Sequence, residues 1–169
     1  MDMNEFTRRL KVMAEKMPAE LDKIHQDVES LALRFIDDNF INQGWEGQPW
    51  KATKRGGTIL VGSGTLKSGF SSEVSQGTIY IRNFVKYANP HNRGFKGTVA
   101  IPEHTRGVYT GSRSKRKKKG TVDVRAHTRN MNLDQRQFVP TPESPSPTFN
   151  RMKRELITEQ LNAHLKNLK

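Results

Sequence analysis

The sequence contains no cysteine, which excludes disulfide bonds, thiolate metal sites and cysteine nucleophiles. It is also poor in hydrophobic residues, which make up 33% of its 169 positions, and its mean hydropathy is −0.79. No apolar run approaches the roughly 20 residues of a membrane span, and the mixed charge of the opening MDMNEFTRRLKVM is not typical of a signal peptide. We therefore expect a protein made inside a cell, with no membrane partner. The low apolar content indicates an elongated shape, a mobile loop, or burial completed by copies of the chain.

Positive charge is concentrated in the middle of a chain whose formal net charge is +12. Residues 1–40 carry nine acidic and six basic residues, whereas residues 41–137 carry five acidic and eighteen basic ones. The densest run consists of Arg113, Lys115, Arg116, Lys117, Lys118 and Lys119. Such a run can contact the backbone of DNA or an acidic protein surface. A non-specific nucleic-acid-binding protein is therefore one interpretation, and a solvated loop framed by glycines is another.

The N-terminal part of the chain is predicted to be helical. Leu21, Ile24, Val28, Leu31 and Phe35 follow one another at spacings of three and four, which places them on one helix face. A proline precedes this stripe at position 18, and proline is tolerated in the first turn of a helix but not in its interior. The pattern predicts either a short helix followed by a long one, or a single helix kinked there.

Strands are predicted between the two terminal helices. After a turn that holds both tryptophans, residues 58–86 are β-rich, with strands over about 67–75 and 78–83 joined at Gln76-Gly77. Farther on, residues 99–101 and 121–124 are expected to pair as the arms of a long hairpin that carries the basic run near its tip.

The whole pattern predicts one α+β domain over residues 1–169, with a small antiparallel sheet and a C-terminal helix packed on it. Ser146 fits the cap of that helix and Pro147 its first turn. Its apolar face is predicted to consist of Phe149, Met152, Leu156, Leu161, Leu165 and Leu168. The expected parts are 1–42 helical, 43–93 a turn and β-hairpin core, 94–137 a basic extended insertion, 138–147 a proline-rich connector and 148–168 the last helix.

The residues that could carry catalysis or hold a metal form no recognisable pattern. The five histidines lack the spacing of a metal site, and the few acidic residues of the middle segment are isolated. The stretch Gly62-Ser-Gly-Thr-Leu-Lys-Ser68 resembles a phosphate loop, but Leu66 stands where a glycine must precede the Lys-Ser pair. We expect no catalytic residue, no metal, no cofactor and no enzymatic activity.

Four short motifs nevertheless follow one another in a definite order. They are WEGQPWK at 45–51, ILVGSGTLKSGF at 59–70, YANPHNRG at 87–94 and RQFVP at 136–140. This series resembles the phage virion morphogenesis, or tail completion, family of Mu-like and other tailed phages, over about residues 20–168. The residues that carry it are Trp45, Trp50, Leu60, Gly64, Leu66, Tyr87, His91, Gly94, Arg136 and Phe138. The insertion over residues 95–135 is longer and more basic than that family's pattern.

The resemblance implies a structural protein of the virion that forms a ring, usually of six copies, at the neck or upper end of the tail. Its partners would be copies of itself, the head–tail connector or stopper proteins, and the tail tube and sheath proteins. Trp45 and Trp50 would lock the turn after the long helix. Tyr87 and His91 would pin the following loop by packing and by a side-chain hydrogen bond. The insertion would touch an adjacent subunit or ring, or line the channel that holds the DNA.

Overall fold

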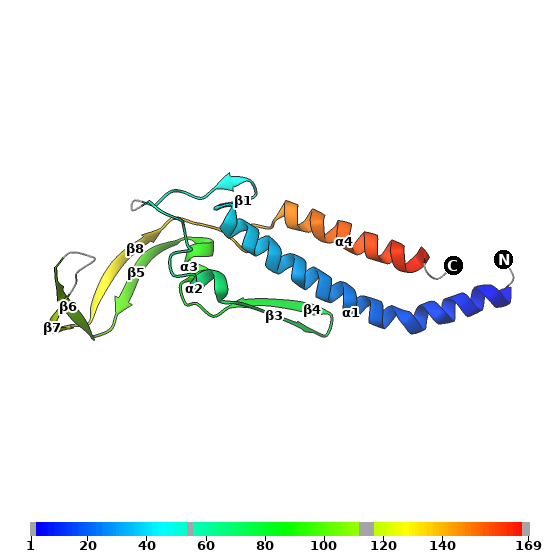
Figure 1. Ribbon diagram of the computed structural model, residues 1–169, viewed down its shortest axis with the longest axis horizontal. Coiled ribbons are helices and arrows are strands. Elements are labelled where there is room, and N and C mark those ends of the chain that lie inside the picture. The colour runs from blue at the N-terminus through cyan, green and yellow to red at the C-terminus, as the bar shows by residue number, and fades with distance from the viewer. Residues whose placement is uncertain (1–2, 54–55, 112–116, 167–169) are drawn as a thin grey trace.

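The chain forms an elongated α+β structure in the computed structural model, which describes residues 3–53, 56–111 and 117–166. Two helices, α1 (Met3–Ile41) and α4 (Pro147–Lys166), lie side by side, and a two-stranded arm projects from the opposite end (Figure 1). Every sheet is a two-stranded antiparallel pair. The predicted fold class is therefore confirmed, although the sheet is divided into separate ribbons.

Helix α1 is continuous, so of the two predicted arrangements the single helix is the observed one. Pro18 lies inside it, and Figure 1 shows the helix changing direction within its N-terminal half. The predicted stripe is buried at Ile24, Val28, Leu31 and Phe35, whereas Leu21 remains 42% exposed. The helix ends as predicted, just before two turn residues.

The hairpin of β3 (Phe70–Ser75) and β4 (Thr78–Asn83) is joined by the predicted tight turn. Gln76 and Gly77 both have positive φ, at 49° and 71°, which matches the twist of the flanking strands. The predicted start of the first strand at residue 67 was wrong, because residues 65–68 form the short helix α2 (Thr65–Ser68). Residues 59–63 are turns and not β structure.

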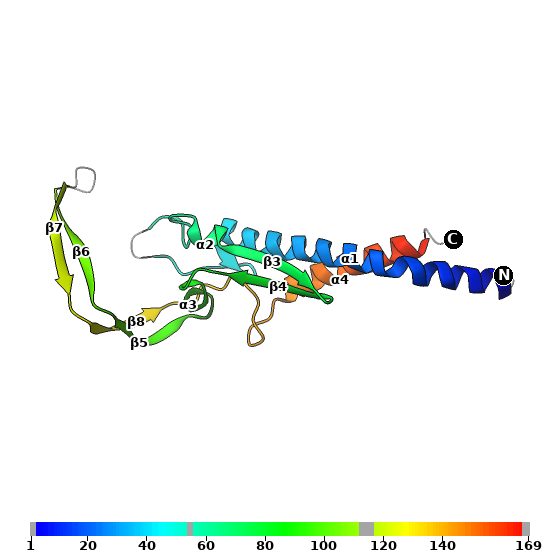
Figure 2. The same cartoon turned by 90° about the horizontal axis from the view of Figure 1, so that it is seen from below.

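The arm begins after α3 (Ala88–Arg93) and consists of two ribbons in series. The inner ribbon pairs β5 (Phe95–Ile101) with β8 (His127–Leu133), and the outer ribbon pairs β6 (His104–Thr110) with β7 (Lys117–Val124). Figure 2 shows the outer ribbon turned sharply away from the inner one.

The predicted pairing within this hairpin was wrong. Val99 lies opposite Arg129, and Thr121 lies opposite Gly107. The apolar clusters suggested the wrong partners, because the strands are extended by polar residues that alternate with apolar ones. Lys117, Lys118 and Lys119 belong to strand β7 and not to a loop.

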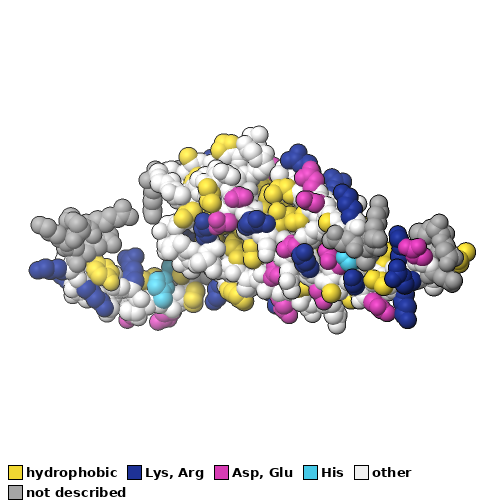
Figure 3. Space-filling view, turned by 45° about the vertical axis from the view of Figure 1, so that its right-hand side comes forward, with side chains coloured by type: hydrophobic (Ala, Val, Ile, Leu, Met, Phe, Trp, Pro, Cys, Tyr) yellow, Lys and Arg dark blue, Asp and Glu magenta, His cyan; other side chains and the backbone are white. Residues whose placement is uncertain are grey.

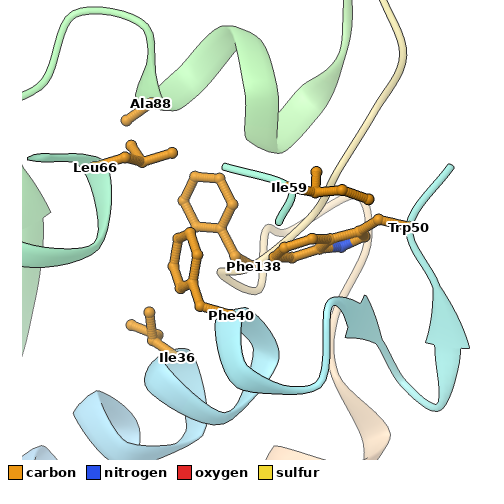
Figure 4. Packing of buried hydrophobic residues seen from close by; sticks show 7 residues of the cluster. All are labelled: Ile36, Phe40, Trp50, Ile59, Leu66, Ala88 and Phe138. Atoms are coloured by element: carbon orange, nitrogen blue, oxygen red, sulfur yellow. The ribbon is translucent and has the colours of Figure 1, made fainter. Parts of the chain in front are cut away.

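The core of the body is a small cluster at the C-terminal end of α1. Its members are Ile36, Phe40, Trp50, Ile59, Leu66, Ala88 and Phe138. Figure 4 shows the rings of Phe40 and Phe138 at its centre, and their centroids are 5.1 Å apart. Phe138 is 2% exposed although its segment belongs to no sheet.

Helix α4 starts as predicted. The Ser146 hydroxyl accepts a hydrogen bond from the Phe149 backbone N–H at 2.9 Å, and Pro147 is the first helical residue. No residue of α4 is fully buried, and Leu165 is 47% exposed, because the helix packs mainly on α1 and not on a sheet. Leu168 lies outside the described residues.

Candidate functional site

The segment Gln135–Val139 crosses the body as an extended chain whose backbone is bound by side chains. The carboxamide oxygen of Asn92 accepts from the backbone N–H groups of Phe138, at 2.8 Å, and Val139, at 2.9 Å. The Asn92 Nδ2 atom donates to the Val139 carbonyl at 3.1 Å. Asn39 on α1 donates to the Phe138 carbonyl at 3.2 Å. These bonds replace the ladder of a sheet, which buried backbone groups would otherwise need.

Trp50 joins the first and last motifs. Its indole N–H donates to the Gln137 carbonyl at 2.9 Å, and its ring meets the Phe40 ring edge-on with centroids 5.7 Å apart. Trp45 makes a similar contact with Phe35, also at 5.7 Å. Both tryptophans therefore hold the turn formed by β1 (Gly44–Trp45) and β2 (Gln48–Pro49) against α1.

Arg136 is buried and ties three segments together. Its backbone N–H donates to the His91 carbonyl at 2.8 Å, and its guanidinium Nε and Nη2 donate to the Lys51 carbonyl at 3.3 and 3.2 Å. A buried guanidinium needs such acceptors, since an unsatisfied charge would be costly. The guanidinium of the motif arginine thus holds the body together through a backbone contact.

His91 packs edge-on against Tyr87, with ring centroids 5.9 Å apart. Its Nδ1 atom is buried and has no hydrogen-bond partner among the described residues, so the predicted side-chain hydrogen bond does not use this atom and otherwise stays a prediction. Burial lowers the pKa of His91, and the positive charge of Arg136 lowers it further. The backbone carbonyl of His91 makes the contact that pins the loop.

The remaining motif residues set the path of the backbone. Gly64 has φ 76° and precedes α2, and Leu66 on that helix is 2% exposed. Leu60 has an unusual positive φ of 61° within the turn that delivers Ile59 to the core. Gly94 has φ 74°, and a Cβ atom there would lie 3.3 Å from Gln135. At this point the arm leaves the body.

Glu46 was not singled out from the sequence, yet it links the β1–β2 turn to α4. Its carboxylate accepts hydrogen bonds from the hydroxyls of Ser146 and Thr148, the latter at 2.6 Å, and from the Thr148 backbone N–H at 3.4 Å. Burial raises the pKa of Glu46, but these hydrogen bonds and the Arg151 charge outweigh it, so the pKa lies below its ordinary value. A carboxylate at a helix N-terminus is favourable.

Asn92 and Asn39 were also missed. Asn92 lies inside the YANPHNRG motif, between His91 and Gly94. The hydrogen-bond partners of Asn92 lie 46 and 47 positions away along the chain. The only sequence signal for its role is therefore that a polar residue stands within a predicted core segment. Asn39 follows two aspartates near the end of α1, so nothing in the local sequence marks it as buried.

The basic run is separate from this cluster. Lys117, Lys118 and Lys119 are exposed on β7, and Tyr109, opposite Lys118, is 53% exposed. Arg113, Lys115 and Arg116 lie outside the described residues. The motif residues therefore build the body, while the three adjacent exposed lysines lie on the arm. This arm is the candidate site for a partner.

The part of the chain that the structure describes holds no cluster of histidine and acidic side chains suited to a metal ion. None of the helices described is both long enough and apolar enough to span a membrane. Comparison with known proteins gives no match to any family, to any curated protein or to any solved structure.

Proposed function

We propose that this protein is a structural component of the virion of a tailed phage or prophage. It forms a ring at the neck or upper end of the tail, completes the tail and joins it to the head connector. Its partners are further copies of itself, the connector or stopper proteins, and the tail tube and sheath proteins. The protein has no catalytic task on this proposal.

The observation that carries the proposal is the convergence of the four sequence motifs. Trp50 and Phe138, 88 positions apart, belong to one apolar cluster with Leu66, and the loop of His91 holds the segment of Arg136. Motifs that contact one another support a shared fold more strongly than motifs scattered over a surface. The thin core and the projecting arm also suit a subunit that completes its burial in an assembly.

A deletion of the gene in the phage or prophage that encodes the chain tests the proposal. We expect DNA-filled heads and separate tails that fail to join, and restoration by the wild-type gene supplied in trans. Antibody labelling of complemented particles should mark the head-proximal end of the tail. Normal infectious particles without the protein, or purified virions that lack it, would contradict the proposal.

Binding of nucleic acid by the arm is a second candidate. It is favoured by the three adjacent exposed lysines and by an exposed tyrosine beside them, because cations and aromatic rings together bind nucleic acids. It predicts tight binding of the purified protein to duplex or single-stranded DNA that weakens steeply with salt. Such binding by a protein that is absent from virions would favour this candidate over the first.

A further inference from the structure

The inner ribbon of the arm has two chemically different faces. Because side chains alternate along a strand, each face is defined by the pairing register. One face carries Phe95, Gly97, Val99 and Ile101 from β5 with Leu133, Met131, Arg129 and His127 from β8. The other face carries Lys96, Thr98 and Ala100 with Asn132, Asn130 and Thr128. The first face is thus apolar with a cation near its centre, and the second is polar.

The apolar face has no extensive contact with any other described helix or strand. Strands β5 and β8 pack chiefly on each other, and the five large apolar residues of this face are all partly exposed. A two-stranded ribbon with no packed face is only marginally stable in water. An apolar face on such a ribbon therefore indicates that something covers it.

The charge of the arm restricts what that cover can be. Residues 95–133 carry ten basic and two acidic residues. No salt bridge joins the basic side chains of the arm's four strands to the part of the chain that the structure describes. On the face in Figure 3, most charged side chains of the arm are basic, whereas acidic and basic ones are mixed over the body. Two arms would repel each other, so the cover is an acidic surface.

Helix α1 carries a row of acidic residues on one face, which we call the acidic stripe. Glu15, Asp22 and Glu29 follow at spacings of seven, which puts them on one face of the helix, whereas Asp37, eight positions farther on, is paired with Lys67 at 2.7 Å. The helix packs on α4 and the β3–β4 hairpin, and Glu15 and Asp22 are exposed while Glu29 is half-buried. Leu33 lies on the same face and lines a hollow of about 140 Å³, whose other walls are Ile36, Phe40, Phe70 and the Asp37–Lys67 ion pair.

We propose that the arm of one copy lies on the acidic face of α1 in the next copy. The apolar face of the inner ribbon covers the helix surface near Leu33, and the cations of the arm meet the acidic stripe. The contact joins two different surfaces, so it propagates from copy to copy. This inference rests on the proposed function for the closure of that chain of copies into a ring and for the place of the ring in the virion.

The size of the contact sets its expected strength. A ribbon of seven residues is about 23 Å long and about 10 Å wide, so each ribbon offers roughly 230 Å². Both ribbons together stay below the roughly 800 Å² per partner of a standard interface. Charge attraction must therefore contribute, and assembly should be dependent on protein concentration and weakened by salt.

Charge reversal tests the contact with two variants. The arm variant is Arg106→Glu with Lys118→Glu and Arg129→Glu, and the helix variant is Glu15→Lys with Asp22→Lys and Glu29→Lys. Sedimentation of the full-length wild type at about 10–200 µM is expected to show species larger than a dimer. Each variant alone should associate at least tenfold more weakly. Their equimolar mixture should regain assembly, with even numbers of copies, because each altered surface then finds a complementary one.

One further variant is a control for charge, and another tests the apolar face. Arg151→Glu with Arg154→Glu and Lys166→Glu makes the same change in charge on α4, and this variant should assemble like the wild type. Val99→Asn with Met131→Asn removes apolar surface without changing charge, and this variant should assemble at least tenfold more weakly. Circular dichroism and unfolding midpoints show which variants keep the wild-type fold, and the mixing result is read from those that do.

The inference is overturned if the wild type remains monomeric over the whole range, if the arm variant assembles normally, or if mixing restores nothing. Dimers between the arm variant and the wild type, with unaltered behaviour of the helix variant, would show arm–arm contact and also overturn it. If deletion of the gene leaves infectious particles normal but the mixed variants assemble, only the proposed function is contradicted. If the deletion prevents heads and tails from joining but the arm variant assembles normally, only this contact is contradicted.

Discussion

Asn92 on α3 holds the backbone of Phe138: its carboxamide oxygen lies 2.8 Å from the Phe138 amide nitrogen. The same oxygen accepts from the next residue, and the Nδ2 atom of the same carboxamide binds that residue's carbonyl. One side chain therefore does the work that a neighbouring strand does in a sheet. We expect the stability of the body to depend on this contact.

Asn92→Ala should destabilise the protein by about 2–4 kcal/mol, because it leaves buried backbone donors without an acceptor. Urea unfolding followed by circular dichroism measures the change. Asn132→Ala is the matched control, since Asn132 is exposed on the arm, and it should alter the unfolding free energy by less than about 0.5 kcal/mol. Equal effects of the two substitutions would contradict the role assigned to Asn92.

Phe138→Ala should cost about 3–5 kcal/mol, because the ring is 2% exposed and contacts Phe40 and Phe70. The midpoint of urea unfolding should fall accordingly, or the variant should be unfolded in buffer. Phe84→Ala offers the comparison, since Phe84 is 76% exposed. A large loss of stability on truncating Phe84, with none at Phe138, is the result that would refute this core.

Glu46→Gln should change how stability depends on pH. The pKa of Glu46 is lowered in the folded protein, so the carboxylate contributes stability that is present above its unfolded pKa, near 4.5, and is lost as pH falls through the lower folded pKa. Glutamine is neutral and keeps only one acceptor oxygen. It therefore cannot accept the hydrogen bonds of Ser146 and Thr148 on two charged oxygens, as the carboxylate of Glu46 does. The variant should be about 1 kcal/mol less stable than the wild type at pH 7.

Urea titrations from pH 7 down to pH 3 measure this difference, which should shrink with acid. Glu155→Gln is the control, because the Glu155 side chain is 69% exposed on α4, the helix whose start Glu46 contacts. Its difference from the wild type should stay small at every pH. A constant penalty for Glu46→Gln across the range would show that the charge of Glu46 does not contribute.

Gly77→Ala should destabilise the β3–β4 hairpin by about 1–2 kcal/mol, because Gly77 has φ 71° and alanine disfavours that conformation. Hydrogen exchange of the hairpin amides reports the local effect, and thermal unfolding reports the global one. Gly62→Ala tests the specificity, since Gly62 has no positive φ and a Cβ atom there has open space around it. If both substitutions behave alike, the turn geometry does not limit stability.

The helices and the first hairpin could be predicted because their signals are local. The three-four spacing from Ile24 to Phe35 marks a buried helix face, and Gln76-Gly77 marks a two-residue turn. These patterns depend on the neighbours within one element. For the same reason Ser146 and Pro147 predicted the start of α4 correctly.

The arm and the core contacts could not be predicted in the same way. In the arm, Val99 and Thr121 belong to different ribbons, and only the full alternation along each strand distinguishes the register. The contacts of Asn92 join residues far apart in sequence, so no periodicity contains them. Glu46 caps a helix that begins about a hundred positions later, and a cap supplied from such a distance has no local pattern.

The two points where the arm leaves the body are tied to each other by hydrogen bonds. Gln135 donates through Nε2 to the Asn92 carbonyl at 3.2 Å, and the Arg136 N–H reaches the His91 carbonyl. The two chain segments that flank the arm are thus held together by contacts within the body. A short linker in place of the arm could bridge them at little cost in chain entropy. The body is a permissive scaffold at this junction: an arm of different length or sequence can be exchanged there while the surrounding fold is retained.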